Sequence, residues 1–289
     1  MREELSYQIA GHVLAVSGEN ICQTMDKLLG FSVFATDKPA EWHVKFDCDL
    51  EKTDYLRLHT FTFEDLSSLD CVFGTRNDNI FVLTLEWNTT SEEIFRMEYS
   101  GGDEVRATKI VEPSRLGYIL WSAFNFLAIP QGAMAIHSST IVCNGRANLF
   151  LGESGTGKST HTRLWLNNIA GSKLLNDDSP ILSVENGRVM VYGSPWSGKT
   201  PCYHNVSFPV NAFVRLRQEK QNVITKLNIF QAFAALQPST PPSLSYSDYY
   251  SSKIIDNLDA ILRQVPVYQL GCLPNDEAAQ LAYSTLYQS

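Results

Sequence analysis

The sequence predicts an α/β protein of the α+β kind, in which a phosphate-binding loop lies in a mixed sheet with hairpins. Three observations support this class. Residues 152–159, "GESGTGKS", match the pattern G-x-x-x-x-G-K-[ST]. Asn-Gly hairpin signals occur on both sides of that motif, and short alternating runs fill the first hundred residues. We expect a β-rich N-terminal domain over residues 1–105 and the loop-bearing domain over residues 106–289.

The N-terminal region shows short runs in which apolar and polar residues alternate. The clearest are "EWHVKFD", "LRLHTFTF" and "NIFVLTLEW", each bounded by turn residues. This period of two is typical of strands with one buried face. The polar stretch Tyr99–Ala107 contains two glycines and predicts a domain boundary. The sequence assigns no role to this region.

An uncharged stretch follows the boundary, over residues 116–136, "LGYILWSAFNFLAIPQGAMAI". Its length would nominally span a bilayer. Asn125 and Pro130–Gly132 interrupt it, however, and it leads directly into a strand pattern. We therefore predict a buried core helix instead of a membrane helix.

Two hairpins are expected, with turns at Asn144-Gly145 and Asn186-Gly187, because Asn-Gly between alternating apolar runs is a strong hairpin signal. Between them, residues 158–170 carry apolar or aromatic side chains at helical spacing. The sequence thus predicts strand, loop, helix around the motif, with the loop following the second arm of a hairpin. Beyond residue 225 the pattern is helical.

Each position of the motif suits a triphosphate. Glycines allow close approach of the backbone, and its N–H groups converge on phosphate oxygens at a helix N-terminus. Lys158 is placed to neutralise the β- and γ-phosphates and Ser159 to ligate Mg²⁺. The residues expected to bind the nucleotide are Gly152, Glu153, Ser154, Gly155, Thr156, Gly157, Lys158, Ser159 and Thr160.

An acidic pair, Asp177 and Asp178, follows a short apolar run in "KLLNDDSPIL". Successive strand residues face opposite ways, so both carboxylates can serve one site only if the strand ends there, as Ser179-Pro180 indicates. One carboxylate would then hold Mg²⁺ and the other would accept a proton from an attacking hydroxyl. A solvated turn would explain the pair equally well away from a phosphate loop.

Two further residues have open interpretations. His137 in "AIHSST" lies on one face of the strand that enters the first hairpin, where a lone histidine is usually structural. Lys199 in "GSPWSGKT" belongs to no second phosphate loop, because Pro201 follows it where a helix would begin. Its side chain could reach an anion or simply lie exposed in a turn.

Together these segments resemble the HPr kinase/phosphorylase-like group, as a divergent HPr-kinase-related member. The resemblance covers about residues 132–217 and is carried by "HSSTIVCNGRANLFLGESGTGKST", "LLNDDSPIL", "GSPWSGKT" and "FPVNAFVRL". It implies the P-loop core that this group shares with phosphoenolpyruvate carboxykinase. It also implies a kinase that uses ATP and Mg²⁺ and modifies an alcohol group, such as a serine.

The resemblance assigns roles to individual residues. Asp178 would be the general base, with Asp177 and Ser159 on the metal and Lys158 on the phosphates. His137 would lie near the transferred phosphate, and Arg215 would stabilise that phosphoryl group. The "E-[IV]-R-G-L-G"-like segment of HPr kinases is replaced here by "VMVYGSPWSGK". Neither HPr as the acceptor nor a reverse phosphorylase activity is therefore implied.

Composition restricts the partners. A net charge of -8 argues against nucleic acid and anionic membranes as partners. Six scattered cysteines without a C-x-x-C, and an N-terminus without a signal-peptide pattern, favour a cytoplasmic protein. Expected partners are ATP and a hydroxyl acceptor that is a protein, a peptide or a small molecule. Homo-oligomers are common among proteins of the group it resembles.

Three functions are consistent with these motifs. The first is an ATP-dependent phosphotransferase that moves the γ-phosphate to a hydroxyl, and the pair Asp177 and Asp178 favours it. The alternative is a non-catalytic, nucleotide-responsive binding module. The third is a mechanochemical NTPase, which the hairpin context and the short run before the aspartates disfavour.

Overall fold

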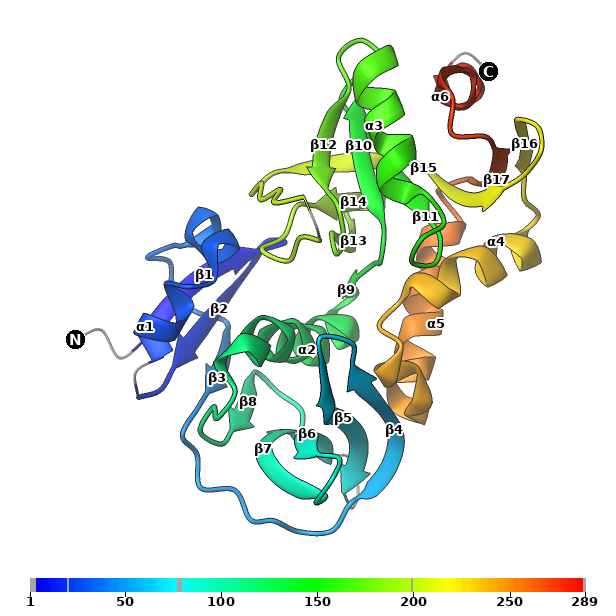
Figure 1. The fold of residues 1–289 in the computed structure, drawn as a ribbon. Helices are drawn as coiled ribbons and strands as arrows, with labels where there is room; N and C mark the ends of the chain where they lie inside the picture. Colours follow the sequence, from blue (N-terminus) through cyan, green and yellow to red (C-terminus); the bar gives the residue numbers. More distant parts are fainter. Residues whose placement is uncertain (1–3, 20, 77–79, 199, 288–289) are drawn as a thin grey trace. The chain divides into compact units, whose positions relative to one another are not determined.

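A computed structural model describes residues 4–19, 21–76, 80–198 and 200–287. The chain forms two compact units (Figure 1). The first comprises Met1–Gln131 with Pro242–Lys253, and the second comprises Gly132–Pro241 with Ile254–Ser289. The fold is mixed α/β, and each unit has its own mixed sheet. The domain boundary near residue 105 stays a prediction.

An eight-stranded sheet forms the first unit, in the order β1-β2-β3-β8-β7-β6-β5-β4. The pairs β2–β3 and β3–β8 are parallel and the other neighbours antiparallel. The strands predicted from alternation in "EWHVKFD", "LRLHTFTF" and "NIFVLTLEW" are present. The strand bounds are β1 Glu4–Ile9, β2 His12–Ser17, β3 Trp42–Lys45, β4 Leu56–Phe63, β5 Leu66–Arg76, β6 Ile80–Trp87, β7 Glu92–Tyr99 and β8 Glu104–Ala107.

Helix α2, Leu116–Ala128, is the buried core helix that its uncharged sequence predicts. Phe124 packs edge-on against Trp42, with ring centroids 5.7 Å apart, and Phe126 stacks on Tyr99 at 5.9 Å. In the described part of the chain, no helix combines the length and apolarity needed to cross a membrane. The short helical segments of this unit are α1 Ile21–Met25, η1 Leu29–Phe34, η2 Pro113–Arg115, η3 Ile129–Gln131 and η5 Ser243–Tyr246.

A second mixed sheet forms the other unit, in the order β12-β10-β11-β15-β14-β13-β9, with β17 beside β15 and β16 beside β17. Strands β11, β15 and β17 run parallel, and the other pairs are antiparallel. The strand bounds are β9 Ala133–Ala135, β10 Ser139–Cys143, β11 Arg146–Leu151, β12 Lys173–Asn176, β13 Ile181–Glu185, β14 Arg188–Tyr192, β15 Ser207–Gln218, β16 Val223–Lys226 and β17 Val267–Cys272.

Both predicted hairpins are confirmed, as β10–β11 and β13–β14. Each turn is built from an Asn and a Gly with positive φ: 50° and 73° at Asn144-Gly145, and 49° and 74° at Asn186-Gly187. Two positive φ values in succession define the turn whose twist matches that of paired strands.

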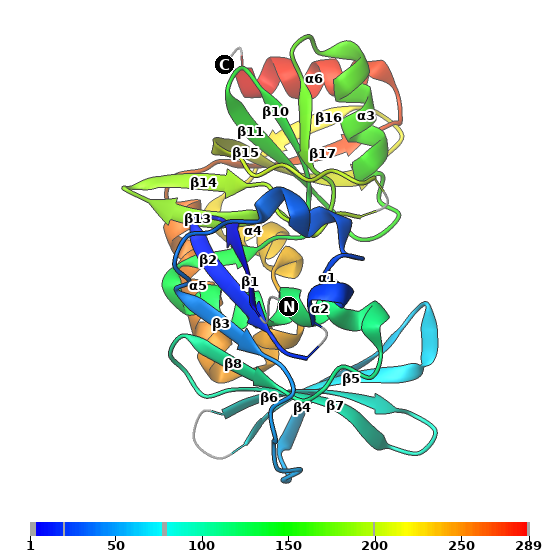
Figure 2. The same cartoon turned by 90° about the vertical axis from the view of Figure 1, so that its left-hand side faces the viewer.

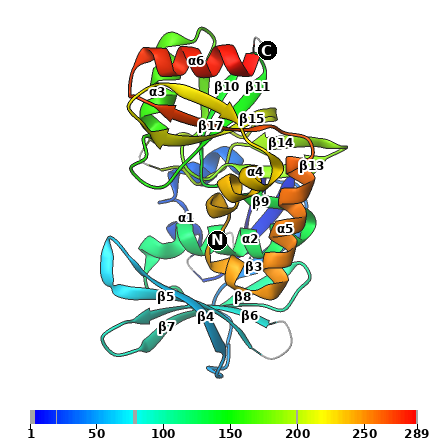
Figure 3. The same ribbon diagram turned by 90° about the vertical axis from the view of Figure 1, so that its right-hand side faces the viewer.

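The helix predicted after the motif is α3, Lys158–Asn168, which lies beside α6 over the sheet (Figures 2 and 3). Trp165 of α3 is fully buried, with Phe150 of β11 on one side and Tyr283 of α6 on another, at centroid distances of 5.6 and 6.0 Å. The remaining helical segments are α4 Ile229–Leu236, η4 Gln237–Ser239, α5 Asp248–Leu262 and α6 Asp276–Tyr287.

The expectation of helix beyond residue 225 was wrong for β17 and for the last residue of β16. Strand β17, Val267–Cys272, lies parallel to β15 and is too short for its alternation to stand out from the helices on either side. With it, β11, which carries the motif, is followed in the sheet by two strands parallel to it: β15 lies beside β11, and β17 lies beside β15.

Candidate active site

The motif forms a loop between β11 and α3, as the sequence predicts. Gly152, Gly155 and Gly157 adopt positive φ values of 156°, 80° and 109°. A β-carbon at Gly152 would lie 3.0 Å from the Thr156 side chain, so a larger residue does not fit there without a shift. Ser154 is exposed in this loop.

Hydrogen bonds within and beside the loop maintain its curve. The Thr156 hydroxyl donates to the Glu153 carbonyl at 2.6 Å, and the Thr156 N–H donates to the same oxygen at 3.2 Å. From β15, the Gln218 amide donates to the Gly155 carbonyl at 3.3 Å. The loop therefore curves in front of the N-terminus of α3, where the helix dipole favours an anion.

Lys158 is the first residue of α3, and its ammonium group folds back over the loop. It donates to the carbonyls of Gly152 and Glu153, at 2.7 and 3.3 Å. Burial lowers the pKa of Lys158, while the charges of Asp178 and Asp177 act in the opposite direction. A phosphate in the loop would compete with the two carbonyls for a cation that is already in place.

Asp177 lies immediately after β12, and its side chain is buried. Its carboxylate accepts hydrogen bonds from Ser139 at 2.7 Å and from Ser159, the motif serine, at 3.3 Å. Among the described residues, no group of three or more His, Cys, Asp or Glu side chains forms a metal cage. Mg²⁺ is commonly held by one or two carboxylates together with substrate phosphates, so this hydroxyl and carboxylate fit it.

Asp178 is closer to solvent and is paired with His137. The histidine Nδ1 lies 3.2 Å from the Asp178 carboxylate, and the two side chains are 47% and 40% exposed. Backbone bonds fix both residues: His137 N–H donates to the Ser239 carbonyl at 2.7 Å, and Ser138 N–H donates to the Asp178 carbonyl at 3.0 Å. This carboxylate is accessible to an incoming hydroxyl in a way that Asp177 is not.

Asn176 is a residue of the site that the sequence analysis did not single out. It is fully buried, and its Oδ1 accepts from the N–H groups of Asp178 and Ser179 at 2.9 and 2.8 Å. Its Nδ2 donates to the Trp196 carbonyl at 3.0 Å. A side-chain oxygen that binds backbone N–H groups two and three residues later forms an Asx turn. "NDDS" was the available signal, because asparagine before such a pair favours this turn.

The segment "GSPWSG" packs against the aspartate turn. Ser194 donates to the Ser179 carbonyl at 2.6 Å, and a β-carbon at Gly198 would lie 3.0 Å from the Asp177 carbonyl. Glycine at position 198 therefore permits the close approach of the two backbones. Lys199 lies outside the described residues.

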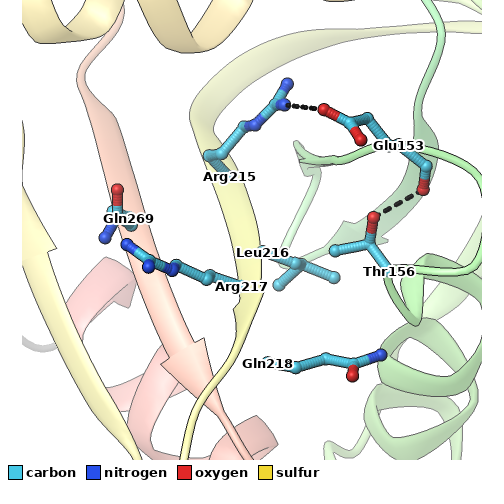
Figure 4. Close-up of a pocket in the computed structure, with 7 residues that line it drawn as sticks. All are labelled: Glu153, Thr156, Arg215, Leu216, Arg217, Gln218 and Gln269. Atoms are coloured by element: carbon cyan, nitrogen blue, oxygen red, sulfur yellow. Dashed lines mark hydrogen bonds and ion pairs between the residues drawn. The ribbon is translucent and has the colours of Figure 1, made fainter.

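Arg215 belongs to β15, and its side chain extends from that strand to Glu153 of the loop (Figure 4). Its guanidinium lies 3.6 Å from the Glu153 carboxylate and donates to the Ala235 carbonyl at 3.2 Å. It lines a pocket of about 260 Å³ together with Glu153, Thr156, Leu216, Arg217, Gln218 and Gln269. Arg215 is therefore beside the loop, facing a charged pocket.

Comparison with known proteins gives a distant likeness. No family model matches the chain, and no curated protein does. One solved structure to which the chain is similar is the Hpr(Ser) kinase/phosphatase from Coxiella burnetii, at 14% sequence identity and a TM-score of 0.30. The match covers 53% of this chain and 93% of that one.

Proposed function

We propose that this protein is an ATP-dependent phosphotransferase, which moves the γ-phosphate of ATP to a hydroxyl on a protein, a peptide or a small molecule. The observation that carries the proposal is that the two adjacent aspartates differ in burial and in their partners. Asp177 is buried against the motif serine, and Asp178 is open to solvent beside His137. We also propose that the sheet of the second unit is the carboxykinase-like P-loop core.

The chain supplies positioning and charge stabilisation. The loop N–H groups and Lys158 would hold the phosphates, and Ser159 with Asp177 would hold Mg²⁺. The metal, when bound, neutralises charge on the β- and γ-phosphates. Ser139 keeps the Asp177 carboxylate turned towards Ser159 through its 2.7 Å hydrogen bond.

Asp178 would accept the proton of the acceptor hydroxyl as that oxygen bonds to the γ-phosphorus. The bond between the γ-phosphorus and the oxygen that bridges it to the β-phosphate breaks, and ADP leaves. His137 would orient the Asp178 carboxylate through the 3.2 Å pair. Arg215 is placed to approach the transferred group if its contact with Glu153 opens.

A labelling experiment tests the proposal. The purified protein is incubated with Mg²⁺, γ-labelled ATP and an extract of the cells from which it comes, beside K158A and D178N. D259N is the matched control, because Asp259 is an exposed helical carboxylate paired with Arg263. We expect the wild type and D259N to transfer label, and K158A and D178N to lose the transfer by at least about 100-fold.

ATP binding is measured on the same four proteins. If the wild type binds ATP and transfers no label to any protein, peptide or metabolite, the phosphotransferase proposal fails and the binding-module alternative takes its place. Equal transfer by D178N and the wild type would remove Asp178 from the role of base.

A further inference from the structure

A second pocket adjoins the phosphate loop, on the side of α3. It has a volume of about 390 Å³, within the range of about 300–1,000 Å³ that is usual for small-molecule sites. The loop and the first turns of α3 form one wall, and the ends of β15 and β17 form the other. We infer that this pocket receives the base and ribose of the nucleotide, an assignment that rests on the proposed function.

The position of the pocket follows from the parallel strands. β11, β15 and β17 run in one direction, so their carboxyl ends lie along the same edge of the sheet. Ligands of open α/β sheets bind outside the carboxyl ends of such strands. Here the end of β11 carries the phosphate loop, and the ends of β15 and β17 carry Gln218 and Leu273, which line the pocket. A nucleotide with its phosphates in the loop can thus extend its nucleoside along this edge.

The walls suit a flat, largely apolar ring. Leu164 of α3, Leu216 of β15, and Leu273 and Pro274 after β17 supply apolar surface. Gln218 and Glu219 add hydrogen-bonding groups at one side, as sites for small molecules commonly combine apolar walls with a few polar groups. The imidazole of His161 also lines the pocket, and burial keeps it neutral by lowering its pKa to about 4.

The neighbouring charged pocket is the competing location. Successive residues of β15 point to opposite faces: Leu216 and Gln218 point towards the side of Thr156, whereas Arg217 points towards Gln269 (Figure 4). The pocket of Arg215, Arg217 and Glu153 offers charges. These charges are already paired, Arg215 with Glu153 and Arg217 with Glu219. A base gains more from apolar contact than from ion pairs of this kind, which favours the pocket beside α3.

Binding of ATP and of inorganic tripolyphosphate, both with Mg²⁺, separates the nucleoside from the phosphates. Two variants fill the pocket: L164W on α3, and L273W, whose leucine is 38% exposed. L166W is the matched control, because Leu166 lies on the same helix, is 42% exposed and does not line the pocket. Q269W fills the charged pocket instead.

We expect L164W and L273W to raise the Kd for ATP by at least about tenfold and to change the Kd for tripolyphosphate by less than about twofold. L166W and Q269W should leave both constants near the wild-type values. Weaker ATP binding by Q269W alone would place the nucleoside in the charged pocket and overturn the inference.

Other outcomes separate this inference from the proposed function. Equal wild-type affinity for ATP and tripolyphosphate would leave phosphate binding standing and overturn a nucleoside pocket. Failure of the wild type to bind either probe would overturn both. ATP binding that the two pocket variants weaken, without transfer of label to an acceptor, would support the pocket and contradict only the phosphotransferase.

Discussion

Asn176 shows at the scale of one residue how the site is held together. Its buried amide binds four polar groups: the N–H groups of Asp178 and Ser179, the Ser194 hydroxyl and the Trp196 carbonyl. Buried polar groups that lose a partner cost more than an average hydrogen bond contributes. This one side chain therefore fixes the backbone turn that carries Asp177 and Asp178, and it joins that turn to the "GSPWSG" segment.

We predict that N176A destabilises the protein by about 1–3 kcal/mol, because it leaves buried N–H groups without their acceptor. The turn also loses its direction, so kcat for phosphotransfer should fall by at least about tenfold while the KM for ATP stays within about threefold of the wild-type value. Urea unfolding and steady-state kinetics measure both effects. N168A is the control, since the Asn168 amide donates to the Leu164 carbonyl and to Asp276 and contacts neither Asp177 nor Asp178. A kcat equal to that of the wild type would show that the turn keeps its direction without this amide.

His161 makes stability depend on pH. Burial lowers its pKa to about 4, and its Nε2 accepts a hydrogen bond from Trp165 at 3.1 Å. In the unfolded chain the pKa returns to about 6.5, so between about pH 6.5 and 4 only the unfolded state binds the proton. The contribution of this residue to stability is present above pH 6.5 and is lost as the pH falls through that window, by about 3 kcal/mol in full.

Urea unfolding of the wild type and H161F at pH 7.5 and pH 4.5 measures this dependence. The free energy of unfolding should fall more steeply in the wild type than in H161F, by about 2–3 kcal/mol between the two pH values. H204F, at an exposed histidine, should follow the wild type. Identical pH dependence in the wild type and H161F would assign the buried imidazole no part in acid unfolding.

At the scale of elements, the glycines of the loop determine how β11 is joined to α3. Gly152 has a φ of 156°, and an added methyl carbon would lie 3.0 Å from the Thr156 side chain, which would have to shift. Gly117, inside α2, is different, because an added methyl would meet only a Leu28 side-chain carbon at 3.8 Å. The same substitution should therefore have opposite effects at the two positions.

We predict that G152A destabilises the protein by more than about 1 kcal/mol and raises the Kd for ATP by at least about tenfold. G117A should instead stabilise the protein by about 0.4–1 kcal/mol and leave ATP binding unchanged, because alanine reduces the conformational freedom of the unfolded chain. Thermal unfolding measures the stability of the two variants, and ATP titration measures their Kd for ATP. Loss of stability in G117A would show that α2 does not tolerate the added methyl group.

At the scale of the whole molecule, each of the two units has its own sheet and its own core. Tyr99, Phe124 and Phe126 belong to the core of the first unit, whereas Phe150 and Trp165 belong to that of the second. Units with separate cores commonly unfold in separate steps. A ligand that binds only the folded form of one unit stabilises that unit.

We therefore predict two calorimetric transitions, and ATP with Mg²⁺ should raise the midpoint of only one of them. At 100 times the Kd, the stabilisation amounts to about 2.7 kcal/mol. The shift should disappear in K158A, which lacks the ammonium of the loop. A single transition, or an equal shift of both, would show that the two units unfold as one.

Local chemistry made much of this fold predictable. The Asn-Gly turns, the loop with its three glycines and the buried apolar helix α2 all follow from what neighbouring residues can adopt or bury. The end of β12 at Asn176, directly before the acidic pair, follows from the same kind of signal. Strand β17 was missed because its six residues carry too little alternation. For Asn176, the local turn to Asp178 and Ser179 was open to prediction, whereas its bonds to positions 194 and 196 lie far along the chain.

The sequence by itself determined which groups are available: a glycine-rich loop before a helix, a lysine and a serine at its end, and two adjacent carboxylates at the end of a strand. Only the tertiary structure decided which carboxylate is buried against Ser159 and which is paired with His137. It also placed two parallel strands beside the loop, and with them the pocket next to α3. The physical reason is that backbone preferences act between neighbours in sequence. Burial and pairing of charges instead depend on segments that meet only when the sheet is formed.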